Sequence, residues 1–135
     1  MTDPVAAARA FALARHEGQR RKDAAGSPYA VHLAEVAALV TQFGGDARTQ
    51  AAAWLHDTVE DTDTTAEEIA ARFGPEVAGI VAELTDDETL PKAERKRAQV
   101  VHAPGRSAAA TLVKLCDKAS NCAGVGFTPP VQWDE

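Results

Sequence analysis

Residues 51–62 read AAAWLHDTVEDT, in which an apolar run leads directly into a polar and acidic one. The apolar residues recur at the three- and four-residue spacing of one helix face, which predicts a helix over residues 47–59. Its inward face is predicted to consist of Ala51, Ala52, Trp54 and Leu55. Alanine-rich segments with few β-branched residues favour closely packed helices over strands. This stretch therefore predicts an all-α fold.

Helical periodicity extends through most of the chain and is interrupted at glycine and proline. Asp3 or Thr2 is placed to cap the first helix, and Gly44 and Gly45 end the second. Further helices are expected over residues 4–16, 28–43, from 64 or 65 to 73, 75–84, 92–102 and 107–122. The inward stripe of the second helix is predicted as Val31, His32, Ala34, Val36, Leu39 and Val40. With no repeat or alternating strand pattern, we expect one helical bundle domain over residues 1–135.

Composition narrows the class of partner. The 20 acidic residues exceed the 14 Lys and Arg, and the net charge of −6 argues against a nucleic-acid binder. A small anionic ligand remains compatible, because basic residues cluster at 20–22 and again at 92 and 95–97. We expect no membrane span or secretion signal. Cys116 and Cys122 are interpreted as small core residues suited to a reducing cytoplasm.

His56 and Asp57 are adjacent at the end of the apolar run and offer an imidazole and a carboxylate from one backbone site. Glu60 and Asp61 follow four residues after them. If the helix continues, each carboxylate lies one turn further along the same face. The plainer interpretation is that an acidic run after a helix is a solvated loop.

Two more polar residues lie in apolar surroundings. His32 is on the apolar face of the second helix, and Asp117 follows the apolar stretch that ends at Cys116. A buried carboxylate without a partner is costly by several kcal/mol. One explanation is that both converge with His56 and Asp57 on a divalent cation. The alternative is that Asp117 pairs with Lys114 or Lys118 and that His32 is a satisfied core histidine.

At these residues the chain resembles the HD-domain hydrolases of the RelA/SpoT type. It is most similar to the small, hydrolase-only members that degrade the alarmone (p)ppGpp. The string HDTVEDT at 56–62 is highly specific when it occurs with GQRRK at 18–22 and with the Pro28-Tyr29 and His32 pattern. Further matching segments follow in order along almost the whole chain: 73–74, 84–87, 94–97, 113–115, 117–118 and 121.

The resemblance implies a cofactor and a set of site residues. The implied cofactor is Mn²⁺, with the ligands His32, His56, Asp57 and Asp117. The residues implied to activate the attacking water are Glu60 and Asp61. The implied substrate-binding residues are Arg21 and Lys22 near the guanine base and phosphates, Lys92 near the phosphates, and Asn121 on the substrate side. The predicted reaction is hydrolysis of the 3′-pyrophosphate of (p)ppGpp to GDP or GTP and pyrophosphate.

The chain also departs from the family. It stops at Glu135, whereas family members continue into a further helix that packs on the core and helps to close the substrate pocket. Residues 120 and 122–124 are smaller than the family's usual side chains. Three alternatives therefore stay open. They are the same chemistry on another nucleotide such as the 2′-phosphate of NADPH, a non-catalytic alarmone-binding domain, and a truncated product that folds poorly or forms a homo-oligomer.

Overall fold

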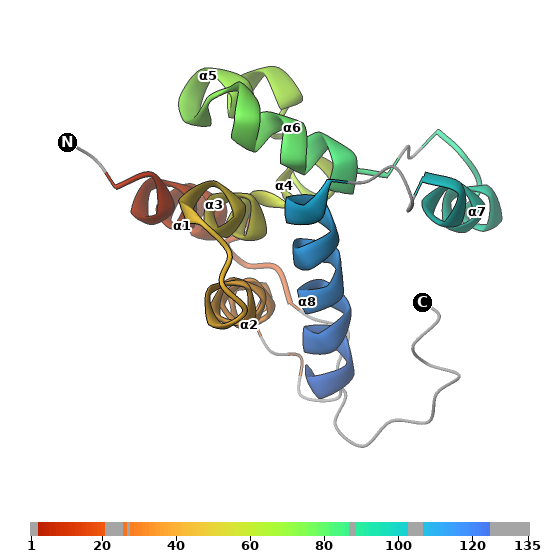
Figure 1. Cartoon of the computed structure of the whole chain (residues 1–135), viewed down its shortest axis with the longest axis horizontal. Helices are drawn as coiled ribbons and strands as arrows, with labels where there is room; N and C mark the ends of the chain where they lie inside the picture. The colour runs from red at the N-terminus through yellow and green to blue at the C-terminus, as the bar shows by residue number, and fades with distance from the viewer. Residues whose placement is uncertain (1–2, 21–25, 27, 87–88, 103–106, 125–135) are drawn as a thin grey trace.

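Helices make up the regular structure of the chain in a computed structural model that describes residues 3–20, 26, 28–86, 89–102 and 107–124 (Figure 1). Within these residues β pairing is limited to an isolated bridge between Arg20 and Pro28. The all-α prediction is therefore confirmed. The predicted substrate contacts Arg21 and Lys22, and the tail 125–135, lie outside the described residues. The helices are α1 (Pro4–Arg15), α2 (Tyr29–Gln42), α3 (Ala47–Leu55), α4 (Thr58–Asp61), α5 (Ala66–Phe73), α6 (Pro75–Leu84), α7 (Lys92–His102) and α8 (Ala108–Gly124).

Polar side chains begin the helices where the sequence predicts them. The carboxylate of Asp3 accepts a hydrogen bond from the backbone N–H of Val5 at 3.0 Å, which caps α1. The hydroxyl of Thr65 accepts one from the N–H of Glu68 at 3.1 Å, which caps α5. Gly44, with a φ of +87°, follows the last turn of α2 in the left-handed region where glycine carries no steric cost.

The prediction of one continuous helix over residues 47–59 is wrong, because α3 ends at Leu55 and the short α4 starts at Thr58. Two side chains take carbonyl oxygens that a continuing helix would use. His56 Nδ1 donates to the carbonyl of Ala53 at 2.6 Å, and the hydroxyl of Thr58 donates to that of Leu55 at 2.7 Å. Such local bonds compete with the backbone ladder and interrupt it. Glu60 and Asp61 therefore do not extend the face of α3.

The buried stripe of α2 also differs from its prediction. The buried residues are spaced by three or four along the helix and are His32, Leu33, Val36, Ala37 and Val40. Val31 is 42% exposed and Ala34 is exposed, although both were predicted to face inward. At 100° per residue, Val31 lies nearly opposite the stripe that Leu33, Val36 and Val40 define.

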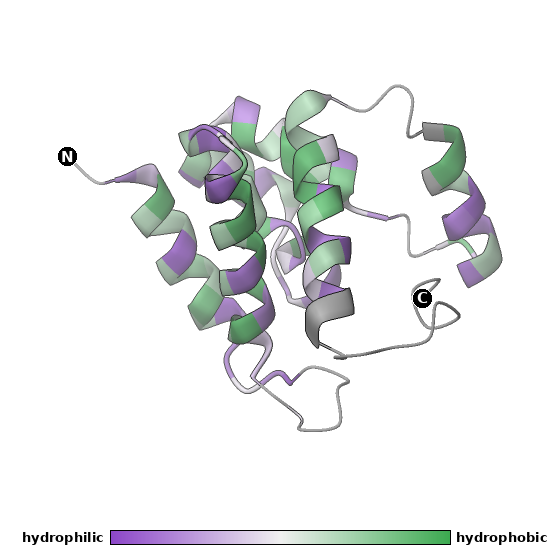
Figure 2. Cartoon of the chain, turned by 60° about the horizontal axis from the view of Figure 1, so that its bottom comes forward, coloured by the Kyte–Doolittle hydropathy of each residue, from purple (hydrophilic) through white to green (hydrophobic). Residues whose placement is uncertain are grey.

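The core lies around α3, which packs against α1, α2, α6 and α8. Its predicted inward residues are all buried, and Leu55 is completely so. Cys116 of α8 is also buried in this core, as predicted, whereas the side chain of Cys122 is outside the description. In Figures 1 and 2, α7 stands apart from the other helices. None of the described helices has the length and apolar character needed to cross a bilayer.

Candidate metal centre

Four side chains from three parts of the fold meet at one place. His32 comes from α2, His56 and Asp57 from the break between α3 and α4, and Asp117 from the middle of α8. One nitrogen or oxygen atom of each lies within 4.8 Å of the corresponding atoms of the others. Both histidines are buried, and both carboxylates are largely shielded from solvent. At the break between α3 and α4, the side chains of the neighbouring residues His56 and Asp57 both reach this place.

The distances between these atoms test whether one cation fits. Asp117 Oδ1 lies 2.8 Å from His32 Nε2 and 3.2 Å from His56 Nε2. Asp57 Oδ2 lies 3.0 Å from His56 Nε2 and 3.8 Å from His32 Nε2. Atoms that bind one first-row cation at about 2.1 Å stand roughly 3.0–3.4 Å from each other. The four side chains therefore fit a divalent cation, with two imidazoles and two carboxylates as donors.

Hydrogen bonds on the far side of each imidazole set its orientation. The Nδ1 of His56 must carry a proton, because its partner, the Ala53 carbonyl, only accepts. The Nδ1 of His32 lies 3.0 Å from the hydroxyl of Ser120, which itself donates to Glu35. In the neutral imidazoles both Nε2 atoms therefore carry a lone pair toward the carboxylates. This is the arrangement in which histidine binds metals.

The proximity of opposite charges shifts the pKa values within the cluster. Burial alone would lower the pKa of His56, but the carboxylates of Asp57 and Asp117 raise it well above its ordinary value. Burial alone would raise the pKa of Asp57, but His56 holds it below its ordinary value. The pKa of Asp117 is likewise lowered against burial, through its hydrogen bonds to His32 and His56. The carboxylates thus stay ionised and available as ligands.

Tyr29 is also a member of the site, although the sequence indicated it only as part of a family pattern and assigned it no role. Its hydroxyl donates to Asp57 Oδ2 at 2.5 Å, and its ring stacks on His16 with centroids 5.0 Å apart. Burial and the neighbouring Asp57 charge raise the pKa of Tyr29 far above its ordinary value, so that it remains a donor. His16 Nδ1 in turn lies 2.8 Å from the side-chain oxygen of Gln19. His16 therefore supports the residue that holds Asp57.

The two predicted catalytic acids differ in their surroundings. Glu60 is half-buried and accepts a hydrogen bond from the backbone N–H of Asp86. Burial raises the pKa of Glu60 to about 7, and the charges of Asp86, Asp57 and Asp61 add to the shift. Asp61 is exposed, and its carbonyl accepts from the Gln19 side chain at 2.9 Å. A carboxyl group that titrates near neutral pH is suited to general base catalysis.

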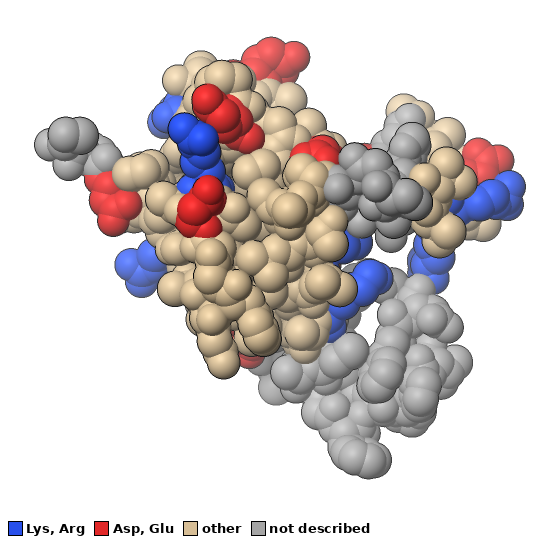
Figure 3. Space-filling model, in the orientation of Figure 1, with Lys and Arg blue, Asp and Glu red and all other residues tan. Residues whose placement is uncertain are grey.

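The two remaining predicted residues that the structure describes, Lys92 and Asn121, lie on the surface. Lys92 is the exposed first residue of α7, and Asn121 is exposed on α8 one turn beyond Asp117. The alternative pairing of Asp117 with a lysine is not what the structure shows, since its carboxylate contacts His32 and His56. Figure 3 shows Lys and Arg side chains (blue) beside and beyond α8 on the viewed face. An anionic ligand would meet favourable charge there.

The chain matches a known family and is similar to proteins of known activity. Residues 8–121 match the family model described as HD domain. The guanosine-3′,5′-bis(diphosphate) 3′-pyrophosphohydrolases MESH1 of Mus musculus and Homo sapiens are each 50% identical over 127 residues, or 93% of this chain and 71% of theirs. A solved structure, of a metazoan ortholog of SpoT that hydrolyzes ppGpp and plays a role in starvation responses, superposes with a TM-score of 0.87 at 35% identity. The match covers 99% of this chain and 79% of that one.

Proposed function

The chain belongs to the HD-domain family, and from this membership we propose that it is a metal-dependent hydrolase of ppGpp and pppGpp. It would remove the 3′-pyrophosphate and leave GDP or GTP. The observation that carries the choice of substrate is the 50% identity, over nearly all of this chain, to relatives named for that reaction. The candidate metal centre supports the metal dependence.

His32, His56, Asp57 and Asp117 are the proposed ligands of the cation. When bound, a divalent cation polarises a phosphoryl oxygen and makes water more acidic. We propose Mn²⁺, because mixed imidazole and carboxylate donors suit this ion, although they also admit Fe²⁺, Zn²⁺ or Ni²⁺. The cytoplasm is the proposed compartment, in keeping with the free thiol of Cys116.

Glu60 is the proposed general base. Its raised pKa lets it take a proton from water near neutral pH, and its bond to the Asp86 N–H fixes the carboxylate in place. Asp61, on the exposed side of α4, is proposed as its partner. Arg21, Lys22, Lys92 and Asn121 are the proposed contacts to the nucleotide. Arg21 offers a planar guanidinium that can stack on a base or bind a phosphate with two hydrogen bonds.

The test follows pyrophosphate release from ppGpp in the presence of Mn²⁺. We expect release by the wild type and its loss in Asp57→Ala and Glu60→Ala, with Glu67→Gln on the exposed surface of α5 as a matched control. Bound Mn²⁺ without release would redirect the search to other nucleotides, with NADPH as the first competitor. If the protein neither binds Mn²⁺ nor releases pyrophosphate, the enzymatic proposal is overturned in favour of an alarmone-binding domain.

A further inference from the structure

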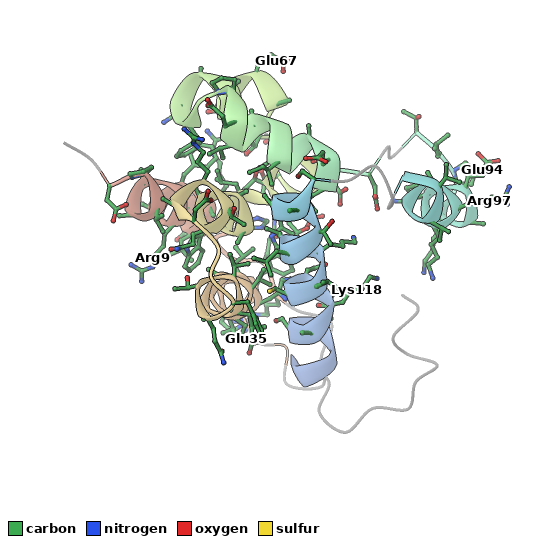
Figure 4. The ribbon with its side chains drawn as sticks, viewed as in Figure 1. Arg9, Glu35, Glu67, Glu94, Arg97 and Lys118 are labelled. Atoms are coloured by element: carbon green, nitrogen blue, oxygen red, sulfur yellow. The ribbon has the colours of Figure 1, made fainter. Side chains whose placement is uncertain are left out.

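Behind His32, away from the carboxylates, two polar side chains continue the line of hydrogen bonds. The His32 Nδ1 lies 3.0 Å from Ser120 Oγ, and this hydroxyl donates to Glu35 Oε2 at 2.6 Å. Ser120 is only 1% exposed and lies on α8, whereas Glu35 lies on α2, the helix that carries His32. The two helices pack side by side, and Figure 4 labels Glu35 on α2.

The chemistry of the three groups fixes the direction of these bonds. Ser120 has a single hydroxyl proton, and it is donated to Oε2 of Glu35. The oxygen of Ser120 is then an acceptor for His32, whose Nδ1 must carry the proton. In the neutral imidazole the lone pair is then on Nε2, the nitrogen that faces Asp57 and Asp117 and would bind the cation.

We propose that Ser120 and Glu35 are positioning residues that set the tautomer and ring orientation of His32 and thereby the affinity for the cation. This inference rests on the metal dependence of the proposed function. A serine inside a helix commonly bonds to a carbonyl one turn back. Here it joins two side chains that are each 85 or more residues distant in sequence. It also ties together α2 and α8, which supply two of the four ligands.

The two histidines are thus held in different ways. His56 is fixed by the main-chain carbonyl of Ala53, which no side-chain substitution removes. His32 depends on side chains alone, so its orientation is the part of the site that substitutions at 35 and 120 can alter. Outer partners of metal-bound histidines typically change metal affinity by about 10- to 100-fold when they are removed.

The experiment measures Mn²⁺ binding by calorimetry in the absence of nucleotide, on metal-free protein whose fold is checked by circular dichroism. We expect Ser120→Ala to weaken Mn²⁺ binding about 10- to 100-fold, and Glu35→Gln to weaken it about 3- to 10-fold, because an amide oxygen still accepts but lacks the charge. If Glu35 acts through Ser120, adding Glu35→Gln to Ser120→Ala causes no further loss. Thr111→Ala on the exposed side of α8 and Glu67→Gln on α5 are matched controls.

Two results would overturn the positioning role alone. The first is a folded Ser120→Ala protein that binds Mn²⁺ within about twofold of the wild type, and the second is independent, additive losses from the two substitutions. If Ser120→Ala does not fold, Glu35→Gln decides the matter, and unchanged binding by that variant rejects the proposal. A wild type that binds no divalent cation would overturn the proposed metal dependence together with the positioning role.

Discussion

The hydroxyl of Tyr29 donates a 2.5 Å hydrogen bond to Oδ2 of Asp57, so that the first residue of α2 fixes the carboxylate at the break between α3 and α4. The same oxygen lies 3.0 Å from His56 Nε2. The ring of Tyr29 is itself held by its stack on the buried His16. Tyr29 and His16, which are not proposed ligands, therefore hold Asp57 in position.

Tyr29→Phe removes the hydroxyl and keeps the ring, so it tests the hydrogen bond to Asp57 apart from the stack on His16. A hydrogen bond to a charged group contributes about 1.5–3 kcal/mol, so we expect kcat for ppGpp to fall by about 10-fold or more while the stack on His16 keeps the fold intact. Steady-state kinetics at saturating Mn²⁺ measures the effect. Tyr29→Ala, which also removes the stack, serves as the comparison and should lower the melting temperature. Wild-type kcat in Tyr29→Phe would show that Asp57 needs no external support.

Glu60→Gln is predicted to stabilise the metal-free protein at pH 8 while it abolishes activity. The folded pKa of about 7 exceeds the ordinary 4.5, so the folded state holds more protons between these values, and the free energy of unfolding falls as pH rises through that window. Glutamine carries no charge, so the free-energy cost of burying an ionised carboxylate disappears. Its amide oxygen still accepts a hydrogen bond from the Asp86 N–H.

The expected gain is about 1 kcal/mol after solvent screening, or roughly 3–5 °C in melting temperature, and it should shrink toward pH 5. Melting curves with a chelator at several pH values measure it. For the wild-type enzyme we expect kcat/KM to rise with pH through an apparent pKa between 4.5 and about 7, since a bound cation favours the ionised carboxylate. A difference between the two proteins that does not vary with pH would contradict the assignment.

The fold was predictable from sequence because helix periodicity and capping residues are local signals. Asp3, Thr65 and the glycines after α2 act through neighbours within a few positions. The break at His56 was not predictable in this way. It arises because the His56 and Thr58 side chains take backbone carbonyls, and propensity does not reveal whether a side chain turns back on its own helix.

The four proposed ligands were recognisable because ionisable residues in apolar segments need an explanation. Their supporting residues gave no such signal. Ser120 is small and neutral, and nothing in its neighbours shows that its hydroxyl joins His32 to Glu35 across two helices. The proposed roles of Arg21 and Lys22 come from family resemblance and stay predictions.

Two glycines, Gly45 in the α2–α3 connection and Gly79 within α6, should respond in opposite directions to alanine. A Cβ at Gly45 would lie 2.5 Å from Cγ1 of Val40, which is completely buried, so Gly45→Ala is expected to destabilise the protein by about 1–3 kcal/mol. A Cβ at Gly79 in α6 meets nothing within 4 Å, so Gly79→Ala should stabilise by about 0.5–1 kcal/mol. Urea unfolding measures both. Equal effects of the two substitutions would contradict the packing of the α2–α3 connection.

Uptake of a cation is predicted to release a proton from His56. Asp57 and Asp117 raise the pKa of His56 well above its ordinary value in the metal-free site, which favours the protonated imidazole, whose Nε2 cannot bind a metal. Protonation thus competes with the ion, and affinity for the ion should weaken as pH falls, by up to about tenfold per pH unit.

Binding calorimetry at pH 7 in buffers of different ionisation enthalpy should give nearly one proton released per ion. Asp117→Asn removes one of the charges that hold the proton, so it should release fewer protons even though it binds the ion more weakly. Uptake at pH 7 with no proton released would mean that His56 is already neutral, or that the ion binds without it.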